Sequence, residues 1–213
     1  MSSEMIQGDI ILSILSIVIL MISVILHEVS HGYMADWLGD PTPRLHGRLT
    51  LNPLRHIDPV GSIVVPIITS LAGFTFGWAK PVVYNPYNLK NKRRGEFLIA
   101  AAGPLSNLLI AVIFGTIIRF MAMSGLASSS FVAVASFIVL INVLLAVFNL
   151  IPLPPLDGSK LFLAFLPSQF GHVRLILERF GPIFVVIIVF FLWQLVSPIV
   201  PYVFKFITGI SLQ

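Results

Sequence analysis

Residues 10–32 have the sequence IILSILSIVILMISVILHEVSHG, a long apolar run that ends in a polar motif. Its apolar part supplies close to the roughly 20 residues that an α-helix needs to cross a hydrocarbon core of about 30 Å. His27, Glu28 and His31 interrupt the apolar run near its end. Ionisable side chains are costly inside a membrane and usually have a function there. The stretch therefore predicts a transmembrane helix that carries a functional site.

The composition of the whole chain also indicates a membrane protein. Of its 213 residues, 57% are hydrophobic and only 10% are charged, whereas soluble domains carry about 25% charged residues. The formal charge of +4 and the pI near 9.7 would be compatible with nucleic-acid binding. In so apolar a chain the basic residues are better explained as anchors beside the membrane, and we expect no nucleic-acid partner. The length favours a single membrane domain over residues 1–213.

Apolar runs long enough to span a membrane occur at four places, about 10–30, 97–121, 131–152 and 182–204. A shorter run at 61–76 contains Pro66 and Gly73, so it is either a short span or a re-entrant segment. We therefore predict an all-α polytopic membrane protein with about four to five transmembrane helices. The polar segments around 41–60 and 77–96 are expected to form loops with short extended pieces near the site.

The positions of Lys and Arg favour a re-entrant segment at 61–76. Basic residues cluster in three segments, 44–55, 80–94 and 160–179. If 61–76 does not cross the membrane, all three clusters lie on one side, which the positive-inside rule makes cytoplasmic. Only Arg119 and Lys205 then face the other side.

The spacing of His27 and His31 predicts a metal site. Residues four apart on a helix share one face, so the two imidazoles can bind one ion. Glu28 lies about 100° around the helix from His27 and can act on water as a general base. The chain has no cysteine, so a metal has to be held by His, Asp, Glu or Asn.

A hydrolytic zinc site normally has three protein ligands, so a third ligand is expected on another helix. Asp157 is the best candidate, because it follows the apolar run 131–152 where prolines and a glycine loosen the helix. With 61–76 re-entrant, Asp157 lies at the same membrane face as His27 and His31. The other carboxylates near the apolar runs are less well placed: Asp9, Asp36, Asp40, Asp58 and Glu96.

HEVSHG at residues 27–32 and NLIPLPPLDG at 149–158 together resemble the paired motifs of the site-2 protease family of intramembrane zinc metalloproteases. FGWAKPV at 76–82 and AAGPLSN at 101–107 extend the similarity to nearly the whole chain. The similarity is to small prokaryotic members without PDZ or CBS domains.

The resemblance implies a zinc endopeptidase that hydrolyses peptide bonds in or near transmembrane segments of membrane proteins. One Zn²⁺ per chain would be held by His27, His31 and Asp157, with Glu28 as the catalytic base. Asn149 matches the asparagine of the second motif and would bind substrate or the developing oxyanion. The implied location is a prokaryotic inner or plasma membrane, with the active site near the cytoplasmic side. Its partners would be transmembrane proteins or peptides, and membrane lipids.

Three further features have plainer interpretations. Asn107 is a polar residue inside a span, where it either lines the substrate cleft or forms hydrogen bonds between helices. The small residues from Ala100 to Gly103 are expected to form a close-packing face. His46, His56 and His172 are in loops and are expected to be surface residues.

The alternative function is a membrane metal-binding protein or a metal transporter without hydrolytic activity. Transporters also place His and Asp inside spans. They do not need a Glu between two histidine ligands, and they usually contain inverted repeats. The sequence has no internal repeat, so the hydrolytic interpretation is preferred.

Overall fold

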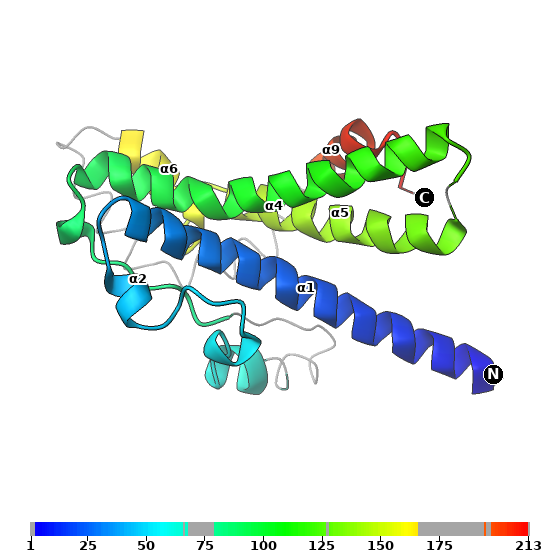
Figure 1. The fold of residues 1–213 in the computed structure, drawn as a ribbon, viewed down its shortest axis with the longest axis horizontal. Coiled ribbons are helices and arrows are strands. Elements are labelled where there is room, and N and C mark those ends of the chain that lie inside the picture. The colour runs from blue at the N-terminus through cyan, green and yellow to red at the C-terminus, as the bar shows by residue number, and fades with distance from the viewer. Residues whose placement is uncertain are drawn as a thin grey trace.

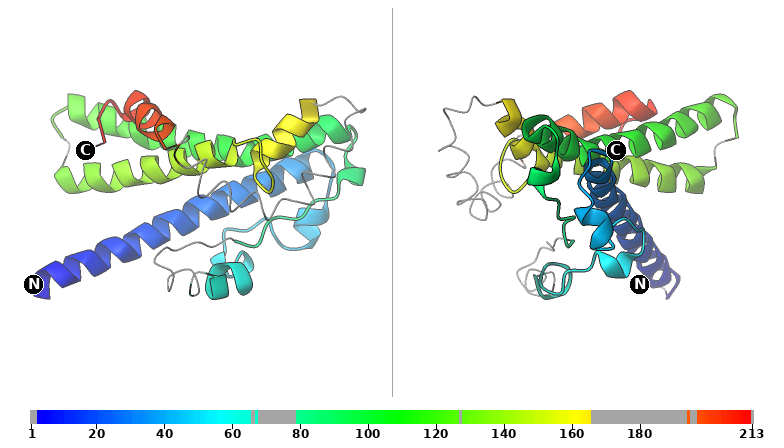
Figure 2. Two further views of the ribbon diagram at one scale, coloured as in Figure 1. Left: turned by 180° about the vertical axis from the view of Figure 1, so that it is seen from behind. Right: turned by 60° about the vertical axis from the view of Figure 1, so that its left-hand side comes forward.

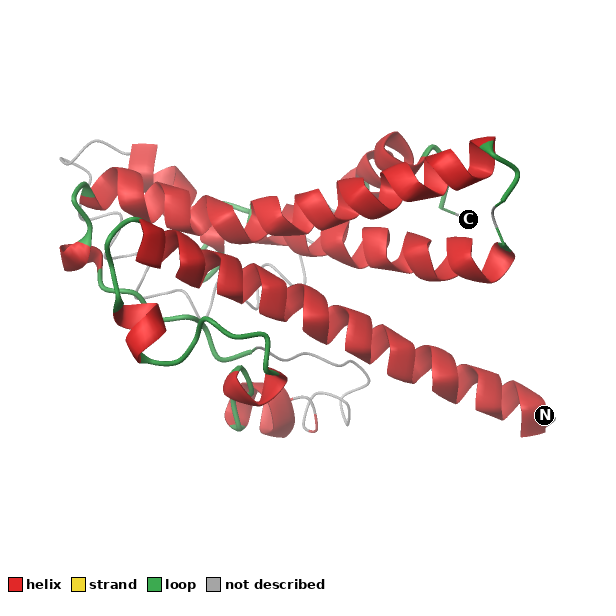
Figure 3. Ribbon diagram, viewed as in Figure 1, coloured by secondary structure: helices red, strands yellow, loops and turns green. Residues whose placement is uncertain are grey.

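The computed structural model describes residues 3–65, 67, 79–126, 128–165, 194 and 197–212. Three long helices dominate it, α1 (Ser3–Trp37), α4 (Lys92–Met123) and α5 (Ser129–Asn149). Helices α4 and α5 lie side by side along most of their length, while α1 packs against α4 at one end and diverges toward its N-terminus (Figures 1 and 2). The described residues form helices and loops but no β-strand (Figure 3).

Three of the predicted spans, 10–30, 97–121 and 131–152, are helical in the structure. Each is long and apolar enough to cross a membrane, as expected of a multi-pass helical membrane protein. The fourth predicted span, 182–204, lies mostly outside the described residues. Its end belongs to α9 (Ile199–Thr208), an apolar helix of 10 residues.

The segment 61–76 also lies largely outside the described residues. Its first residues belong to η2 (Val60–Val64), a short π-helix that follows Pro59. The re-entrant course of this segment therefore stays a prediction.

Side-chain caps mark where α4 and α5 begin. Asn91 accepts a hydrogen bond from the backbone N–H of Arg94 at 3.0 Å, and Ser128 accepts one from Phe131 at 3.3 Å. Such caps satisfy backbone donors that have no partner within the helix. The remaining described helices are short: α2 (Thr42–Leu45), η1 (Pro53–Arg55), η3 (Pro86–Asn88) and α6 (Asp157–Phe165).

The apolar core at one end of the molecule joins α4, α5 and α9. It contains Ala111 and Ile118 of α4, Val139 of α5 and Phe204 of α9, all buried. Gly115 lets α9 approach α4 closely, because a Cβ at this position would lie 2.3 Å from Cγ2 of Ile207. Small residues allow such close helix contacts in membranes.

At the other end, Asp40 joins the turn after α1 to the residues that precede α4. Its buried carboxylate accepts hydrogen bonds from Thr42 Oγ1 at 2.6 Å, Asn88 Nδ2 at 2.7 Å, Asn85 N at 2.6 Å and Thr42 N at 3.1 Å. Burial alone would raise the pKa of this carboxyl, but the hydrogen bonds outweigh burial and lower the pKa. Asp40 therefore stabilises the fold in its charged form.

We expect Asp40→Asn to lower the free energy of unfolding at neutral pH by about 1.5–3 kcal/mol, the range for hydrogen bonds to a charged group. The Asp40 contribution is fully present above the unfolded pKa of about 3.9 and is lost as the pH falls through the lower folded pKa. The difference between the two proteins should thus shrink on acidification. Denaturant unfolding in detergent micelles, followed by circular dichroism, measures it.

The control for this experiment is Asp36→Asn, because the partner of Asp36 is the exposed Arg44. Exposed ion pairs contribute about 0–1 kcal/mol. An Asp40 variant as stable as the Asp36 variant would contradict the role given to Asp40.

The prediction that His56 is a surface residue is wrong. Its side chain is buried, with 2% of the residue exposed, and Nε2 lies 2.8 Å from the carbonyl oxygen of Thr50. The backbone carbonyl of His56 accepts a hydrogen bond from Lys80 N at 2.8 Å and so anchors the non-helical segment 79–85. His46 is exposed as expected, and His172 lies outside the described residues.

Candidate metal centre

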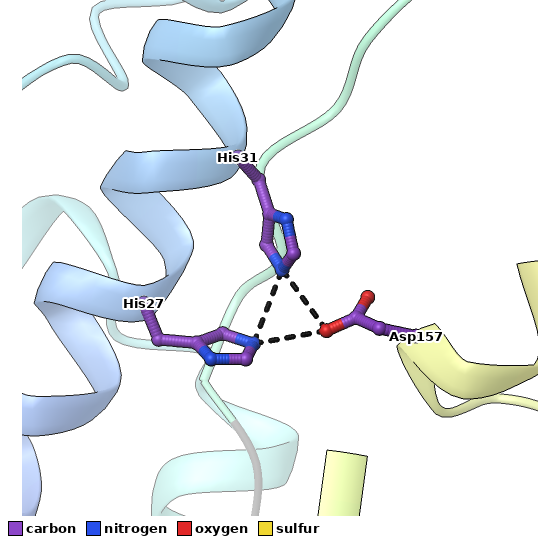
Figure 4. Close-up of side chains that lie close together, drawn as sticks. All are labelled: His27, His31 and Asp157. Atoms are coloured by element: carbon purple, nitrogen blue, oxygen red, sulfur yellow. Dashed lines mark hydrogen bonds and ion pairs between the residues drawn. The ribbon is translucent and has the colours of Figure 1, made fainter. Parts of the chain in front are cut away.

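The structure brings His27, His31 and Asp157 together, although 126 residues separate His31 from Asp157. The two histidines lie on α1, and Asp157 is the first residue of α6. Nε2 of His27, Nε2 of His31 and Oδ2 of Asp157 are each 3.1 Å from the other two atoms. Figure 4 shows the three side chains pointing toward one another.

This triangle fits a zinc ion. In a tetrahedral site with bonds of about 2.0–2.1 Å, the ligand atoms lie about 3.3–3.4 Å apart, close to the separation seen here. Two imidazole nitrogens and one carboxylate oxygen are also a donor set of catalytic zinc sites, which keep a fourth position open. All three residues are buried, with 6–8% of each exposed.

The outer ring nitrogens of both histidines have their own partners. His31 Nδ1 lies 2.6 Å from the carbonyl oxygen of Ile99, which can only accept, so this nitrogen carries the proton. His27 Nδ1 lies 2.6 Å from Oδ1 of Asn107. These contacts orient the rings and leave Nε2 of each histidine facing Asp157.

Asp157 is presented by a tight turn. A Cβ on the next residue, Gly158, would lie 2.3 Å from the carbonyl oxygens of Leu150 and Ile151, so only glycine fits there. The turn places Oδ2 of Asp157 3.1 Å from Nε2 of each histidine, where it supplies the third donor atom for a cation.

The imidazole rings of both histidines pack against Gly103 of α4. A Cβ at this position would lie 2.4 Å from His31 Nε2 and 2.6 Å from His27 Cε1. The predicted close packing of the small residues from Ala100 to Gly103 is seen at Gly103, and Ala100 and Ala102 are buried as well. The sequence did not indicate that the histidine pair packs against Gly103.

Glu28 is half-buried beside the triangle and faces the segment 79–85. Its Oε2 accepts a hydrogen bond from the backbone N–H of Val82 at 2.9 Å. Gly32 makes room for this approach, because a Cβ there would lie 3.1 Å from Val82 Cγ1. The sequence analysis did not single out Gly32 or Val82. The available signals were the position of Gly32 directly after HEVSH and the position of Val82 at the end of FGWAKPV.

The two predicted asparagines lie in different surroundings. Asn107 is fully buried between the helices and contacts His27. Asn149 is the last residue of α5 and half-buried, and its Nδ2 donates to the carbonyl of Leu145 at 2.9 Å. A role of either residue in binding substrate or an oxyanion stays a prediction.

Comparisons with known proteins point to one class of enzyme. The model of peptidase family M50 matches residues 114–195, a range that contains Asn149 and Asp157. The chain is 36% identical over 186 residues to "Putative zinc metalloprotease YwhC" of Bacillus subtilis, covering 85% of this chain and 81% of the relative.

Two more distant relatives carry similar names. "Putative zinc metalloprotease Rip2" of Mycolicibacterium smegmatis is 33% identical over 139 residues, which are 65% of this chain and 52% of the relative. "Zinc metalloprotease MJ0392" of Methanocaldococcus jannaschii is 24% identical over 157 residues, which are 74% of this chain and 36% of the relative. The chain thus spans about half the length of Rip2 and about a third of MJ0392. No solved structure matches the chain significantly.

The relatives are zinc metalloproteases by name, and the His-His-Asp triangle has the donor set and spacing that zinc requires. The similarity to YwhC covers most of both chains. The chain therefore belongs to peptidase family M50, the site-2 protease family, and is a zinc metalloprotease.

Proposed function

We propose that this protein hydrolyses peptide bonds in or near transmembrane segments of membrane proteins. The observation that carries the proposal is the triangle of His27, His31 and Asp157 within a bundle of apolar helices, with Glu28 beside it. A protease with its active site among membrane-spanning helices would act on substrates that are embedded in the same membrane. The whole chain, residues 1–213, would act as one catalytic domain.

His27, His31 and Asp157 would hold the zinc ion. Zinc in such a site polarises a carbonyl group and makes water a stronger acid. Glu28 would accept the proton of the attacking water and then pass it to the leaving amine. Oε2 of Glu28 accepts a hydrogen bond from the N–H of Val82, so Oε1 would be the oxygen that takes this proton.

The substrate has to unwind locally before it can be cut. A helical segment hides its carbonyl groups in hydrogen bonds, so the scissile bond must be held in an extended form. The non-helical segment 79–85 passes Glu28 and offers backbone groups for such a docking by strand addition. Asn149 remains a candidate for binding the substrate or the oxyanion.

The distribution of charge supports an active site near the cytoplasmic side of the cell membrane. His31 is followed within two turns by the end of α1, and it bonds to Ile99 near the start of α4. That start carries Lys92, Arg93 and Arg94. By the positive-inside rule these residues face the cytoplasm, and the site lies at the same end. A short path to that face would supply water.

The alternative of a transporter without hydrolysis has less support. The matched relatives bear the names of proteases. A site that only transports metal would also not require a general base such as Glu28. Membrane lipids and transmembrane proteins are then the expected partners.

The test is cleavage of a panel of transmembrane peptides by the purified protein in liposomes. Removal of zinc by a chelator should lower the cleavage rate by about 100-fold or more, and added zinc should restore it. The matched control is the same treatment of the Glu28→Gln protein. Zinc transport into the liposomes without any peptide cleavage would instead support the transporter.

A further inference from the structure

Three polar side chains lie behind the metal centre, where α1, α4 and α5 meet. They are Ser23 of α1, Asn107 of α4 and Asn142 of α5, with 4%, 0% and 0% of each residue exposed. Buried polar groups between membrane helices need hydrogen-bond partners, because no water or lipid group supplies them. Each of the three finds its partners among the others and the backbone.

The orientation of Asn142 is fixed by a backbone group. Its Nδ2 lies 2.9 Å from the carbonyl oxygen of Ile138 and 2.9 Å from Oγ of Ser23. Because the carbonyl oxygen can only accept, the amide nitrogen must be the atom that faces it. The amide oxygen of Asn142 then faces α4.

The orientation of Asn107 follows from that of Asn142. Nδ2 of Asn107 lies 2.8 Å from Oδ1 of Asn142 and 3.3 Å from the carbonyl oxygen of Ser23, and both of these atoms accept. The amide oxygen of Asn107 is therefore the atom that faces His27, at 2.6 Å from Nδ1. An amide oxygen can only accept, so Nδ1 of His27 carries the proton.

We propose that Asn107 and Asn142 are positioning residues that fix the tautomer of His27. The amide chain begins at the carbonyl of Ile138 and ends at His27, where it leaves the lone pair of Nε2 facing Asp157. His31 reaches the same state through a direct bond to the carbonyl of Ile99. The inference rests on the proposed role of His27 as a zinc ligand.

The affinity for zinc should depend on the amide chain. Asn107→Leu removes the acceptor for His27 Nδ1 and should weaken zinc binding by about 10–100-fold, as is usual for partners of metal-bound histidines. Asn107→Asp keeps an acceptor oxygen and should bind zinc more tightly than Asn107→Leu. Asn142 makes no contact with His27, but Asn142→Leu leaves the Asn107 amide held only by its longer bond to the Ser23 carbonyl, so this variant should also weaken binding, by less than Asn107→Leu.

The experiment is a competition between the purified variants and a coloured chelator for zinc in detergent micelles. Thr116→Val is the control on α4, because the exposed Thr116 hydroxyl donates to the carbonyl of Val112 and is not part of the amide chain. Circular dichroism of the zinc-free proteins separates a loss of affinity from a loss of helix. Equal zinc affinity of the wild type and both Leu variants would overturn the proposal.

Nitrogen NMR of the zinc-loaded wild type tests the tautomer without any variant. We expect a protonated Nδ1 and a metal-bound Nε2 on His27, and the opposite assignment would overturn the proposal. A wild type that binds zinc and cleaves peptides while the Leu variants bind zinc equally well refutes only the amide chain. A wild type that binds no zinc refutes the proposed metal site, and the amide chain with it.

Discussion

Glu28→Gln should keep its zinc and lose peptide hydrolysis by about 100- to 10,000-fold, the usual contribution of general acid–base catalysis. The glutamine has nearly the same shape as the glutamate, and its amide oxygen can still accept the hydrogen bond from Val82 N. It cannot take a proton from water at neutral pH. Cleavage of a transmembrane peptide and the zinc content of the purified protein measure the two effects separately.

Asp36→Asn is the matched control, because Asp36 is a half-buried carboxylate on the same helix that pairs with Arg44 and not with the metal centre. It should cleave at the rate of the wild type. Cleavage by Glu28→Gln at that same rate would remove Glu28 from the mechanism. The substrates themselves can be sought by comparing the membrane proteomes of cells that produce the wild type and Glu28→Gln.

Gly103→Ala should lose most of its zinc although alanine favours a helix over glycine by about 1 kcal/mol. The added methyl group would overlap His31 Nε2 at 2.4 Å and His27 Cε1 at 2.6 Å. The rings cannot move away freely, because Ile99 and Asn107 hold their outer nitrogens. Overpacking of this kind costs about 1–3 kcal/mol, or about 5- to 150-fold in zinc affinity.

Gly95→Ala is the control for this variant. It is the same change on the same helix, but its Cβ would meet the end of the flexible Leu89 side chain at 2.8 Å. Zinc content, cleavage rate and helix content should be measured for both proteins. If Gly103→Ala bound zinc as tightly as Gly95→Ala, the histidine pair would not rest on α4 as described.

The sequence predicted those parts of the fold that depend on local patterns. The helices α1, α4 and α5 follow from the length of their apolar runs. His27 and His31 follow from helical spacing, and Asp157 from topology and the lack of other well-placed carboxylates. The triangle of 3.1 Å contacts in the structure agrees with that placement.

The contacts that the sequence did not reveal join residues far apart in the chain. Asn107 lies 80 residues from His27, and Val82 lies 54 residues from Glu28. Which of several polar groups meets another depends on how the helices pack, and no local pattern records it. The surface exposure predicted for His56 was wrong for the same reason, because the loop around this residue buries it.

The packing of Gly103 against the two histidines also gives a way to sort protein sequences. A relative that keeps HEVSH-like and LDG-like motifs but carries a side chain at this position is expected to bind zinc poorly. A residue with any side chain at the position of Gly103 would fill the space of the imidazoles. The residue at this position, read together with the two motifs, therefore predicts which members of the family can hold the metal.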